Sequence, residues 1–221
     1  MSPRMASQRQ IVDVLLARYG TTFAEELSIP LARSTPSPLF RLLCASLLFS
    51  ARISARIATA AARALAVQGW TTAAKMAAAT WAERTRVLNR SGYARYDERT
   101  SRMLGETAGL LLARYGGDLR RLRDAAGREP ARERQLLMEF KGIGEVGADI
   151  FFREAQVVWG EWYPFVDPKA RKGAAELGLP AAGPVELVAL VSAADFPRLL
   201  AALVRVQLAH GQEEVLAASD C

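Results

Sequence analysis

The residue best placed to do chemistry is Asp167, which stands between an aromatic-rich stretch and Pro168. An aspartate followed by proline is a good start for a helix, because the carboxylate caps the first amides and proline fits the first helical position. This structural role alone could explain the residue. A cap aspartate is also held rigidly and kept ionised, so it could stabilise positive charge that develops in a reaction at a cleft edge.

Two glycines flank one aliphatic residue in the stretch Gly142-Ile143-Gly144, and Asp167 follows 25 residues after Gly142. Glycine permits unusual backbone angles and close approach to another backbone. We expect a tight turn between two helices here, with the N-terminal amides of the second helix pointing outward as an anion site. A DNA phosphate could bind there without base contacts. The same pattern also occurs in ordinary helix–helix turns.

The positive charge of the chain, formally +6 in 221 residues, is confined to one quarter of it. The segment from Arg84 to Arg134 holds 13 arginines and 7 acidic residues, whereas the remainder holds 16 basic and 16 acidic residues. Arginine suits planar, bidentate contact with phosphate. We therefore expect this quarter to face a nucleic-acid backbone, with binding that weakens as salt rises. A solvated helix surface is the alternative.

The composition excludes several classes of protein. Hydrophobic residues make up 51%, enough for one large domain or two small lobes and too many for disorder. Two cysteines, Cys44 and Cys221, cannot build a disulfide scaffold, and a lone His210 cannot build a His-rich metal site. No apolar run approaches the roughly 18 residues of a membrane span, and the N-terminus lacks a secretory segment. We expect a cytoplasmic monomer with no membrane partner.

Helices are the elements that must position these residues. Apolar residues recur at helical spacing and alternating strand patterns are nearly absent, which predicts an all-α fold with short loops. Ser37, Ser54, Thr71 and Thr80 are the predicted N-caps of early helices, and residues 22–37 are the longest predicted irregular stretch. Later helices are predicted from Asp97 to the Gly116-Gly117 stop, from Asp118, and at 130–140, 145–158, 168–177, 185–194 and 197–209.

Four segments follow one another in an informative order: 47–54, 91–96, 140–144 and 160–167. Together they resemble the helix-hairpin-helix/Gly-Pro-Asp superfamily of DNA glycosylases, which includes endonuclease III and the adenine-mismatch glycosylase. The first is similar to the family's first barrel helix and the turn after it, and the second to a loop with a DNA-inserting side chain. The last two are similar to the hairpin and to the loop that ends in the family's aspartate. The resemblance covers about residues 36–178.

The resemblance implies two helical lobes with a DNA-binding cleft between them. A six-helix barrel with the hairpin would comprise residues 24–157. A second lobe, carrying the catalytic aspartate, would combine residues 1–23 and 158–221.

The activity that the resemblance implies is base-excision DNA repair by an N-glycosylase. Such an enzyme flips a damaged or mispaired base out of double-stranded DNA and hydrolyses its N-glycosidic bond. Asp167 matches the catalytic carboxylate, which stabilises the oxocarbenium ion and activates water. An intracellular, nucleoid-associated location follows from this role. The alternatives are a catalytically inert helix-hairpin-helix DNA-binding protein and a bifunctional glycosylase/lyase with a displaced lysine.

The chain departs from the family at the lysine of its bifunctional members. That lysine attacks the sugar and leads through a Schiff base to strand cleavage, and the matching position here is Val146. Lys141, Lys169 and Lys172 lie nearby in the sequence, but none falls on the motif position. We therefore expect a monofunctional hydrolase without lyase activity at abasic sites.

No cofactor is expected. Endonuclease III-like members often hold a [4Fe–4S] cluster in a four-cysteine loop, and two cysteines cannot supply four thiolates. The resemblance does suggest a structural, phosphate-bridging Na⁺ or K⁺ bound by the backbone carbonyls of Lys141, Ile143 and Val146.

The resemblance also supplies candidate contacts with DNA and with the flipped base. Tyr93 takes the place of the inserting wedge and Arg52 that of a residue contacting the opposite strand; packing on the barrel and a solvated helix end are the structural alternatives. The full DNA-binding set is Gly142, Ile143, Gly144, Glu145, Gly147, Arg52, Tyr93, Arg95 and Lys169. The candidates for the base pocket are Trp162, Tyr163 and Phe165.

The substrate class is suggested by a missing acid. Adenine-specific members protonate the base with a glutamate whose matching position here is about Ser46. A substrate that is already cationic, or whose base leaves readily, removes the need for that acid. Alkylated purines and electron-poor pyrimidines have this property.

Overall fold

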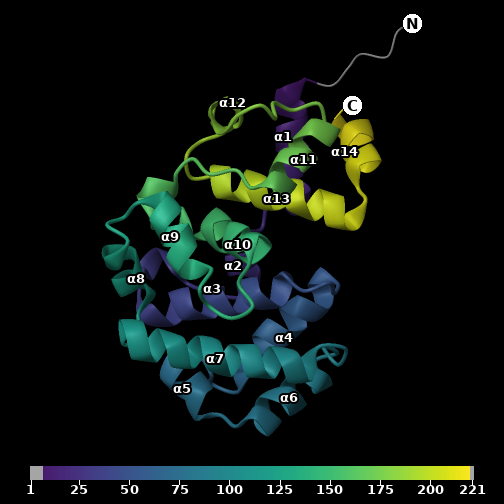
Figure 1. Ribbon diagram of the computed structural model, residues 1–221. Helices are drawn as coiled ribbons and strands as arrows, with labels where there is room; N and C mark the ends of the chain where they lie inside the picture. The colour runs from purple at the N-terminus through teal and green to yellow at the C-terminus, as the bar shows by residue number, and fades with distance from the viewer. Residues whose placement is uncertain (1–6, 220–221) are drawn as a thin grey trace, which may run out of the picture. The chain divides into compact units, whose positions relative to one another are not determined.

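The computed structural model describes residues 7–219, and every regular element in that range is a helix (Figure 1). The predicted all-α class is therefore confirmed. No helix in this range is long and apolar enough to cross a membrane.

The α-helices are α1 (Gln8–Tyr19), α2 (Phe23–Glu26), α3 (Pro36–Phe49), α4 (Ala55–Val67), α5 (Ala73–Ala78), α6 (Trp81–Arg90), α7 (Asp97–Tyr115), α8 (Leu119–Ala125), α9 (Pro130–Leu137), α10 (Glu145–Ala155), α11 (Pro168–Glu176), α12 (Pro184–Val188), α13 (Phe196–Ala209) and α14 (Gln212–Ser219), with short 3₁₀ helices η1 (Leu31–Arg33) and η2 (Gly160–Trp162).

The described chain divides into two compact units. The central unit is Leu27–Glu161, and the terminal unit combines the described residues before and after it. The terminal unit therefore contains α1, α2 and α11 to α14. The assignment of a barrel to residues 24–157 and of a catalytic lobe to the rest stays a prediction.

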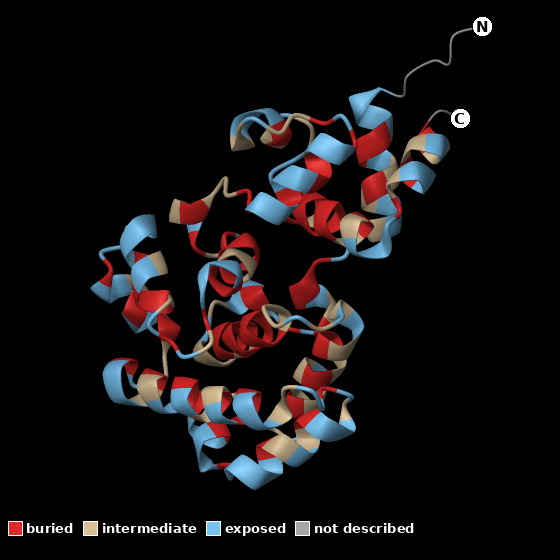
Figure 2. Ribbon diagram, turned by 45° about the vertical axis from the view of Figure 1, so that its right-hand side comes forward, coloured by how far each residue is buried: buried red, intermediate tan, exposed pale blue. Residues whose placement is uncertain are grey.

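Helix α3 forms the core of the central unit. Residues 42–48 are all buried, so two successive turns of α3 have no exposed face. Helices α4 and α10 pack against α3, while α5 and α6 pack against α7. Helix α7 has buried residues on one face and exposed residues on the other, as Figure 2 shows. The central unit is thus an all-round buried helix covered by amphipathic ones.

The terminal unit is built around α13, which is buried along most of its length. Helices α1 and α11 pack against α13, and α14 packs against α1. The α11–α13 contact needs a glycine, because a Cβ at Gly173 would lie 2.4 Å from the Leu203 carbonyl oxygen. This close approach fixes the position of α11, the helix that Asp167 precedes.

Several predicted helix ends are confirmed. The hydroxyl of Ser54 accepts a hydrogen bond from the Ile57 amide at the start of α4. Thr80 and Glu83 form a capping box at α6, and Asp118 caps α8. Gly116 ends α7 in the left-handed conformation that favours glycine.

Other predicted helix boundaries are wrong. Helix α3 begins two residues before the predicted Pro38, because Pro36 takes the first helical position behind Thr35, and the Ser37 hydroxyl donates to the Thr71 carbonyl instead of capping. Thr72, rather than Thr71, caps α5. The stretch 22–37 contains α2 and η1, and α14 was not anticipated. At α3 and α5 the local pattern fitted two nearby start positions, whereas α2, η1 and α14 are short elements that were missed altogether.

An ion pair joins α8 to η2 within the central unit. The guanidinium of Arg123 donates to both carboxylate oxygens of Glu161 and lies 5.5 Å from the centre of the Trp159 ring. Burial raises the pKa of Glu161, but hydrogen bonds with Arg123 and Glu133 outweigh it and lower this pKa to about 2. The carboxylate therefore stabilises the folded state in its charged form.

This ion pair predicts an acid-sensitive part of the stability. Because the pKa of Glu161 falls from an ordinary 4.5 to about 2 on folding, its contribution is complete above pH 4.5 and is lost as the pH drops toward 2. The difference in unfolding free energy between wild type and Glu161→Gln, measured by urea denaturation, should shrink over that range. Glu139→Gln, which removes an exposed partner of Arg114, is the control and should give a small difference. A difference for Glu161→Gln that does not change with pH would contradict the prediction.

Candidate nucleic-acid interface and carboxylate

The predicted turn joins α9 to α10, and its first glycine is required for two reasons. Gly142 has a φ of +89°, which favours glycine, and a Cβ at this position would lie 2.8 Å from the Met103 sulfur and 3.2 Å from a Leu47 methyl. Ile143, by contrast, is buried beneath the turn. The turn is therefore seated on α3 and α7 through Gly142 and Ile143.

The N-terminus of α10 is open to an anion. Its N-cap is Gly144, which has no side chain to bond the first amides, and Glu145 and Val146 of the first turn are exposed. Unpaired amides at a helix start bind phosphate and other anions. The carboxylate of Glu145 is bonded by the Arg134 guanidinium of α9, which also reaches Asp149 at 2.7 Å. Arg134 thus ties the two helices of the hairpin together.

Three of the four segments singled out in the sequence meet at the C-terminal end of α3. The hairpin lies there, since a Cβ at Gly147 would be 3.7 Å from the Ser50 Cβ. The 91–96 loop is attached to the same end, because the Tyr93 hydroxyl donates to the Leu48 carbonyl at 3.0 Å. This loop also approaches α4, with a Cβ at Gly92 placed 3.9 Å from Ile57. One face of the central unit therefore gathers the hairpin, the turn after α3 and this loop.

The placement of Tyr93 corrects the prediction that it inserts into DNA. Its side chain is fully buried, and burial raises the pKa of its hydroxyl to about 12. In this structure the ring has no exposed surface with which to fill the gap left by a flipped base. Tyr93 instead anchors the 91–96 loop to α3, which is the packing alternative.

Arg52 and Arg95 are exposed cations of these segments, as is Lys141 in the hairpin turn. Arg52 lies in the turn between α3 and α4, and Arg95 lies in the loop with its guanidinium 5.3 Å from the Tyr96 ring. Neither forms an ion pair with another described residue. Both side chains remain able to contact phosphate or a base edge.

The arginines between Arg84 and Arg134 have different roles. Arg84 is buried, and ion pairs occupy five others: Arg114, Arg120, Arg123, Arg128 and Arg134. The exposed arginines of the segment that form no ion pair with described residues are Arg86, Arg90, Arg95, Arg99, Arg102, Arg121 and Arg132. The surface available to an anionic partner is therefore smaller than the sequence count indicates, and contact of the whole segment with DNA stays a prediction.

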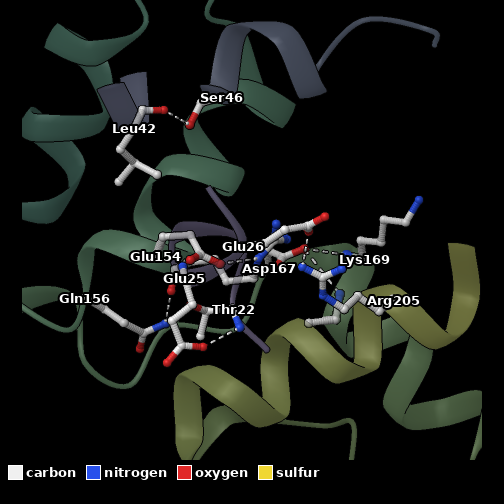
Figure 3. A network of polar contacts seen from close by, with 12 residues as sticks. Thr22, Glu25, Glu26, Leu42, Ser46, Glu154, Gln156, Asp167, Lys169 and Arg205 are labelled. Atoms are coloured by element: carbon white, nitrogen blue, oxygen red, sulfur yellow. Dashed lines mark hydrogen bonds and ion pairs between the residues drawn. The ribbon is translucent and has the colours of Figure 1, made fainter. Parts of the chain in front are cut away.

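Asp167 lies in the terminal unit as the N-cap of α11. The residue is 1% exposed, and its carboxylate accepts from the amides of Lys169 at 3.0 Å and Ala170 at 3.2 Å (Figure 3). The predicted cap is thus confirmed, and Pro168 takes the first helical position. Lys169 is exposed, and in Figure 3 its side chain extends away from the carboxylate. These two hydrogen bonds fix the orientation of the carboxylate.

The aromatic residues before Asp167 divide between the two units. Trp159 is fully buried in the central unit, against Phe151 and Phe152. In the terminal unit, Trp162 and Phe165 form an edge-to-face pair with ring centres 5.1 Å apart. Tyr163 packs edge-on against Phe196. Each proposed pocket residue thus has an aromatic partner within the protein, and a role in binding a base stays a prediction.

The structure also shows how far each residue that departs from the glycosylase pattern is buried. Val146 is 59% exposed. Ser46 is buried and donates to the Leu42 carbonyl at 2.9 Å, as Figure 3 shows, so it points into α3. Cys44 is buried, which raises the pKa of its thiol, and Cys221 lies outside the described residues. Within residues 7–219 no cluster of His, Cys, Asp and Glu side chains is arranged to hold a metal.

One carbonyl of the predicted cation site has a partner within the protein. The backbone carbonyl of Lys141 accepts from the Thr107 hydroxyl of α7 at 3.1 Å. A carbonyl has two lone pairs, so this bond leaves room for a second ligand. The Na⁺ or K⁺ site at Lys141, Ile143 and Val146 stays a prediction.

Sequence reasoning missed two residues that shape the hairpin. Thr107 fixes the Lys141 carbonyl, and Arg134 joins α9 to α10. Neither has a local signature, because each acts on a segment many residues away. A count of arginines includes Arg134 but cannot show that it is already paired.

No protein-family model matches the chain, and no curated protein matches it. Among solved structures, the chain is similar to one described as a trapped endonuclease III–DNA covalent intermediate in an estranged-adenine complex. The two chains are 17% identical, the match covers 76% of this chain and 73% of the other, and the TM-score is 0.49. Nothing about the activity of this chain follows from a likeness of that size.

The interface predicts different results for Arg52, Arg95 and Tyr93. Arg52→Gln and Arg95→Gln should weaken binding to duplex DNA, and each lost phosphate contact should reduce the logarithmic salt slope by about 1. Tyr93→Phe should leave the affinity unchanged and lower the unfolding free energy by about 1 kcal/mol, because it removes one buried hydrogen bond. Fluorescence anisotropy at several salt concentrations measures the affinities. Arg33→Gln, an exposed arginine of η1, is the control, and Arg52→Gln and Arg95→Gln variants that bind like this control would contradict the prediction.

Proposed function

We propose that this protein is a base-excision DNA repair glycosylase that removes a damaged or mispaired base by hydrolysing its N-glycosidic bond. The observation that carries the proposal is the gathering of the hairpin, the turn after α3 and the 91–96 loop on one face of the central unit. The order of these segments, followed by a loop that ends in Asp167, is what resembles the glycosylase superfamily.

Binding to DNA would begin at the hairpin. The uncapped amides of α10 suit a backbone phosphate, and Arg52 and Arg95 add positive charge beside them. Contacts of this kind hold the duplex without reading its sequence. A flipped base would then leave a gap, and Arg52 and Arg95 are exposed candidates to fill it, whereas the predicted Tyr93 is buried.

Cleavage would depend on the charge of Asp167. As the glycosidic bond breaks, the sugar becomes an oxocarbenium ion, which a fixed carboxylate stabilises more in the transition state than in the ground state. The same carboxylate orients or deprotonates the attacking water. The two amide bonds from α11 hold the carboxylate in place for both roles, and contact with the sugar requires the residues that cover Asp167 to move aside.

The proposed enzyme is a hydrolase without lyase activity. Lyase chemistry needs an amine to attack the sugar, and Val146 occupies the motif position. Since Ser46 is buried and bonded within α3, it supplies no acid to the base. We therefore assign bases that leave readily, such as alkylated purines and electron-poor pyrimidines, as the substrate class.

An inert DNA-binding protein is the competing function, because capping α11 is by itself a sufficient reason for an aspartate at position 167. Such a protein would use the same face of the central unit to hold damaged or bent DNA. It would bind duplex DNA and release no base from it.

Asp167→Asn separates the two functions. Asparagine is as good an N-cap as aspartate, so the variant should fold normally and bind DNA with unchanged affinity. Base release from a panel of alkylated, deaminated and oxidised duplexes should fall by about 10²–10⁴-fold, as expected for loss of an acid–base group. Asp118→Asn, which alters the cap of α8 in the same way, should keep full activity. If the wild-type protein releases no base from any of these duplexes, the result supports the inert DNA-binding function instead.

The absence of a lyase step is tested by borohydride trapping, which captures a Schiff base between an amine and DNA. Wild type should give no covalent adduct with duplexes that it processes. Val146→Lys places an amine at an exposed position in the first turn of α10, and it should give an adduct at an abasic site. An adduct with wild type would instead assign the bifunctional alternative, and Lys169→Gln would identify one candidate lysine.

A further inference from the structure

The central unit has a second candidate site, on the side of α7 that carries α5 and α6. A cavity of about 630 Å³ is lined by Ala77 of α5, Trp81 and Arg84 of α6, and Arg102, Gly105 and Glu106 of α7. The hairpin contacts α7 through Met103 and Thr107, which lie on another face of the helix. In Figure 1, α5 and α6 lie across α7 from α3 and α10. This cavity is therefore separate from the proposed DNA face.

Arg84 is a buried cation without a carboxylate. Only 7% of the residue is exposed, and its guanidinium donates to three neutral carbonyls, those of Ser101, Met76 and Ala79. No ion pair joins it to another described residue. Burial lowers its pKa, the cost of keeping a positive charge out of water, and the nearby charge of Glu83 raises this pKa by less. An anion in the cavity would remove that cost.

Space for this guanidinium is made by a glycine within a helix. A Cβ at Gly105 would lie 2.5 Å from the Arg84 Nη2 atom. Glycine inside a helix costs about 1 kcal/mol relative to alanine. The Nη2 atom has no hydrogen-bond acceptor among the described residues. Its N–H donors are therefore available to a ligand in the cavity that Arg84 lines.

Three side chains around Arg84 offer different chemistry. Trp81 is 43% exposed, and its indole N–H donates to the Glu98 carbonyl at 3.2 Å, which fixes the orientation of the ring. Arg102 is exposed and forms no ion pair with another described residue. Glu106, also exposed, offers carboxylate oxygens as acceptors. The cavity thus combines two cations, a flat aromatic face and one acceptor.

We propose that this cavity binds a phosphate monoester attached to a planar base, with Arg84 and Arg102 on the phosphate and Trp81 against the base. Arginine matches phosphate bidentately, and an exposed tryptophan face stacks on any base. Glu106 would accept from an amino group on the base. The hollow is open to solvent and has room for a ligand of this kind. The ligand chemistry is shared by a free mononucleotide and by the 5′-phosphorylated end of a strand.

Tryptophan fluorescence tests the proposal directly. Adenosine 5′-monophosphate is the probe, and adenosine, which lacks the phosphate, is the matched ligand. Wild type should show a saturable change in emission with the monophosphate, a weaker response to adenosine, and competition by inorganic phosphate. The change should vanish in Trp81→Phe, which assigns it to this ring, since Trp159 and Trp162 are buried and the partly exposed Trp70 does not line the cavity.

Two variants examine the phosphate contact. Arg102→Gln should weaken the affinity for the monophosphate about tenfold, as expected for one charge-assisted hydrogen bond. Arg99→Gln, an exposed arginine three residues earlier on α7 that does not line the cavity, should bind like wild type. Gly105→Ala forces Arg84 to move, so it should weaken binding while circular dichroism and the melting temperature show that the protein is folded.

The source of the phosphate is decided with single-stranded oligonucleotides that carry either a 5′-phosphate or a 5′-hydroxyl. Preference for the phosphorylated strand over the monophosphate assigns a strand end, and the reverse preference assigns a free nucleotide. The proposal is overturned if calorimetry and fluorescence detect no binding at millimolar monophosphate, or if Arg102→Gln and Arg99→Gln bind alike. Since Arg52→Gln affects only the DNA face, its normal binding of the monophosphate keeps this test independent of the glycosylase assays.

Discussion

The burial of α3 on every side is the constraint on which the central unit depends. Residues 42–48 leave no face for water, so the neighbouring segments must cover the helix completely. The hairpin does so through Gly142 and Ile143, and the 91–96 loop does so through Tyr93. Hydrophobic burial thus determines where the polar ends of these segments emerge. The exposed amides of α10 and the side chains of Arg52 and Arg95 share one face because their supports share one helix.

Local signals in the sequence were sufficient to predict the class of fold and many of the positions at which its helices begin. Ser54, Thr80, Asp118 and Asp167 cap their helices because a short polar side chain before an apolar run has few other uses. Where two registers were equally good, as at Ser37 and Pro36, the choice depended on packing with residues far along the chain. A single sequence contains no direct record of that packing.

The candidate site could be predicted only in part, for the same reason. The type and order of its residues were readable, but the direction in which a side chain points was not. Tyr93 has the loop position of an inserting residue and the environment of a core residue. Arg84 and Arg95 look alike in a charge count, yet one is buried against carbonyls and the other is exposed. Burial is a property of the assembled unit, and it decides which arginines can meet a partner.

The double role of Asp167 has a consequence for how substitutions at this position would be seen. Its carboxylate holds the first turn of α11, and α11 is packed against α13 too closely to shift. Most replacements would therefore reduce the cellular abundance of the protein as well as any turnover. A saturation scan that scores abundance alone would classify position 167 as structural and overlook its charge. Asparagine and serine both keep the cap without the charge, so the ratio of activity to abundance for those two variants carries the chemical information.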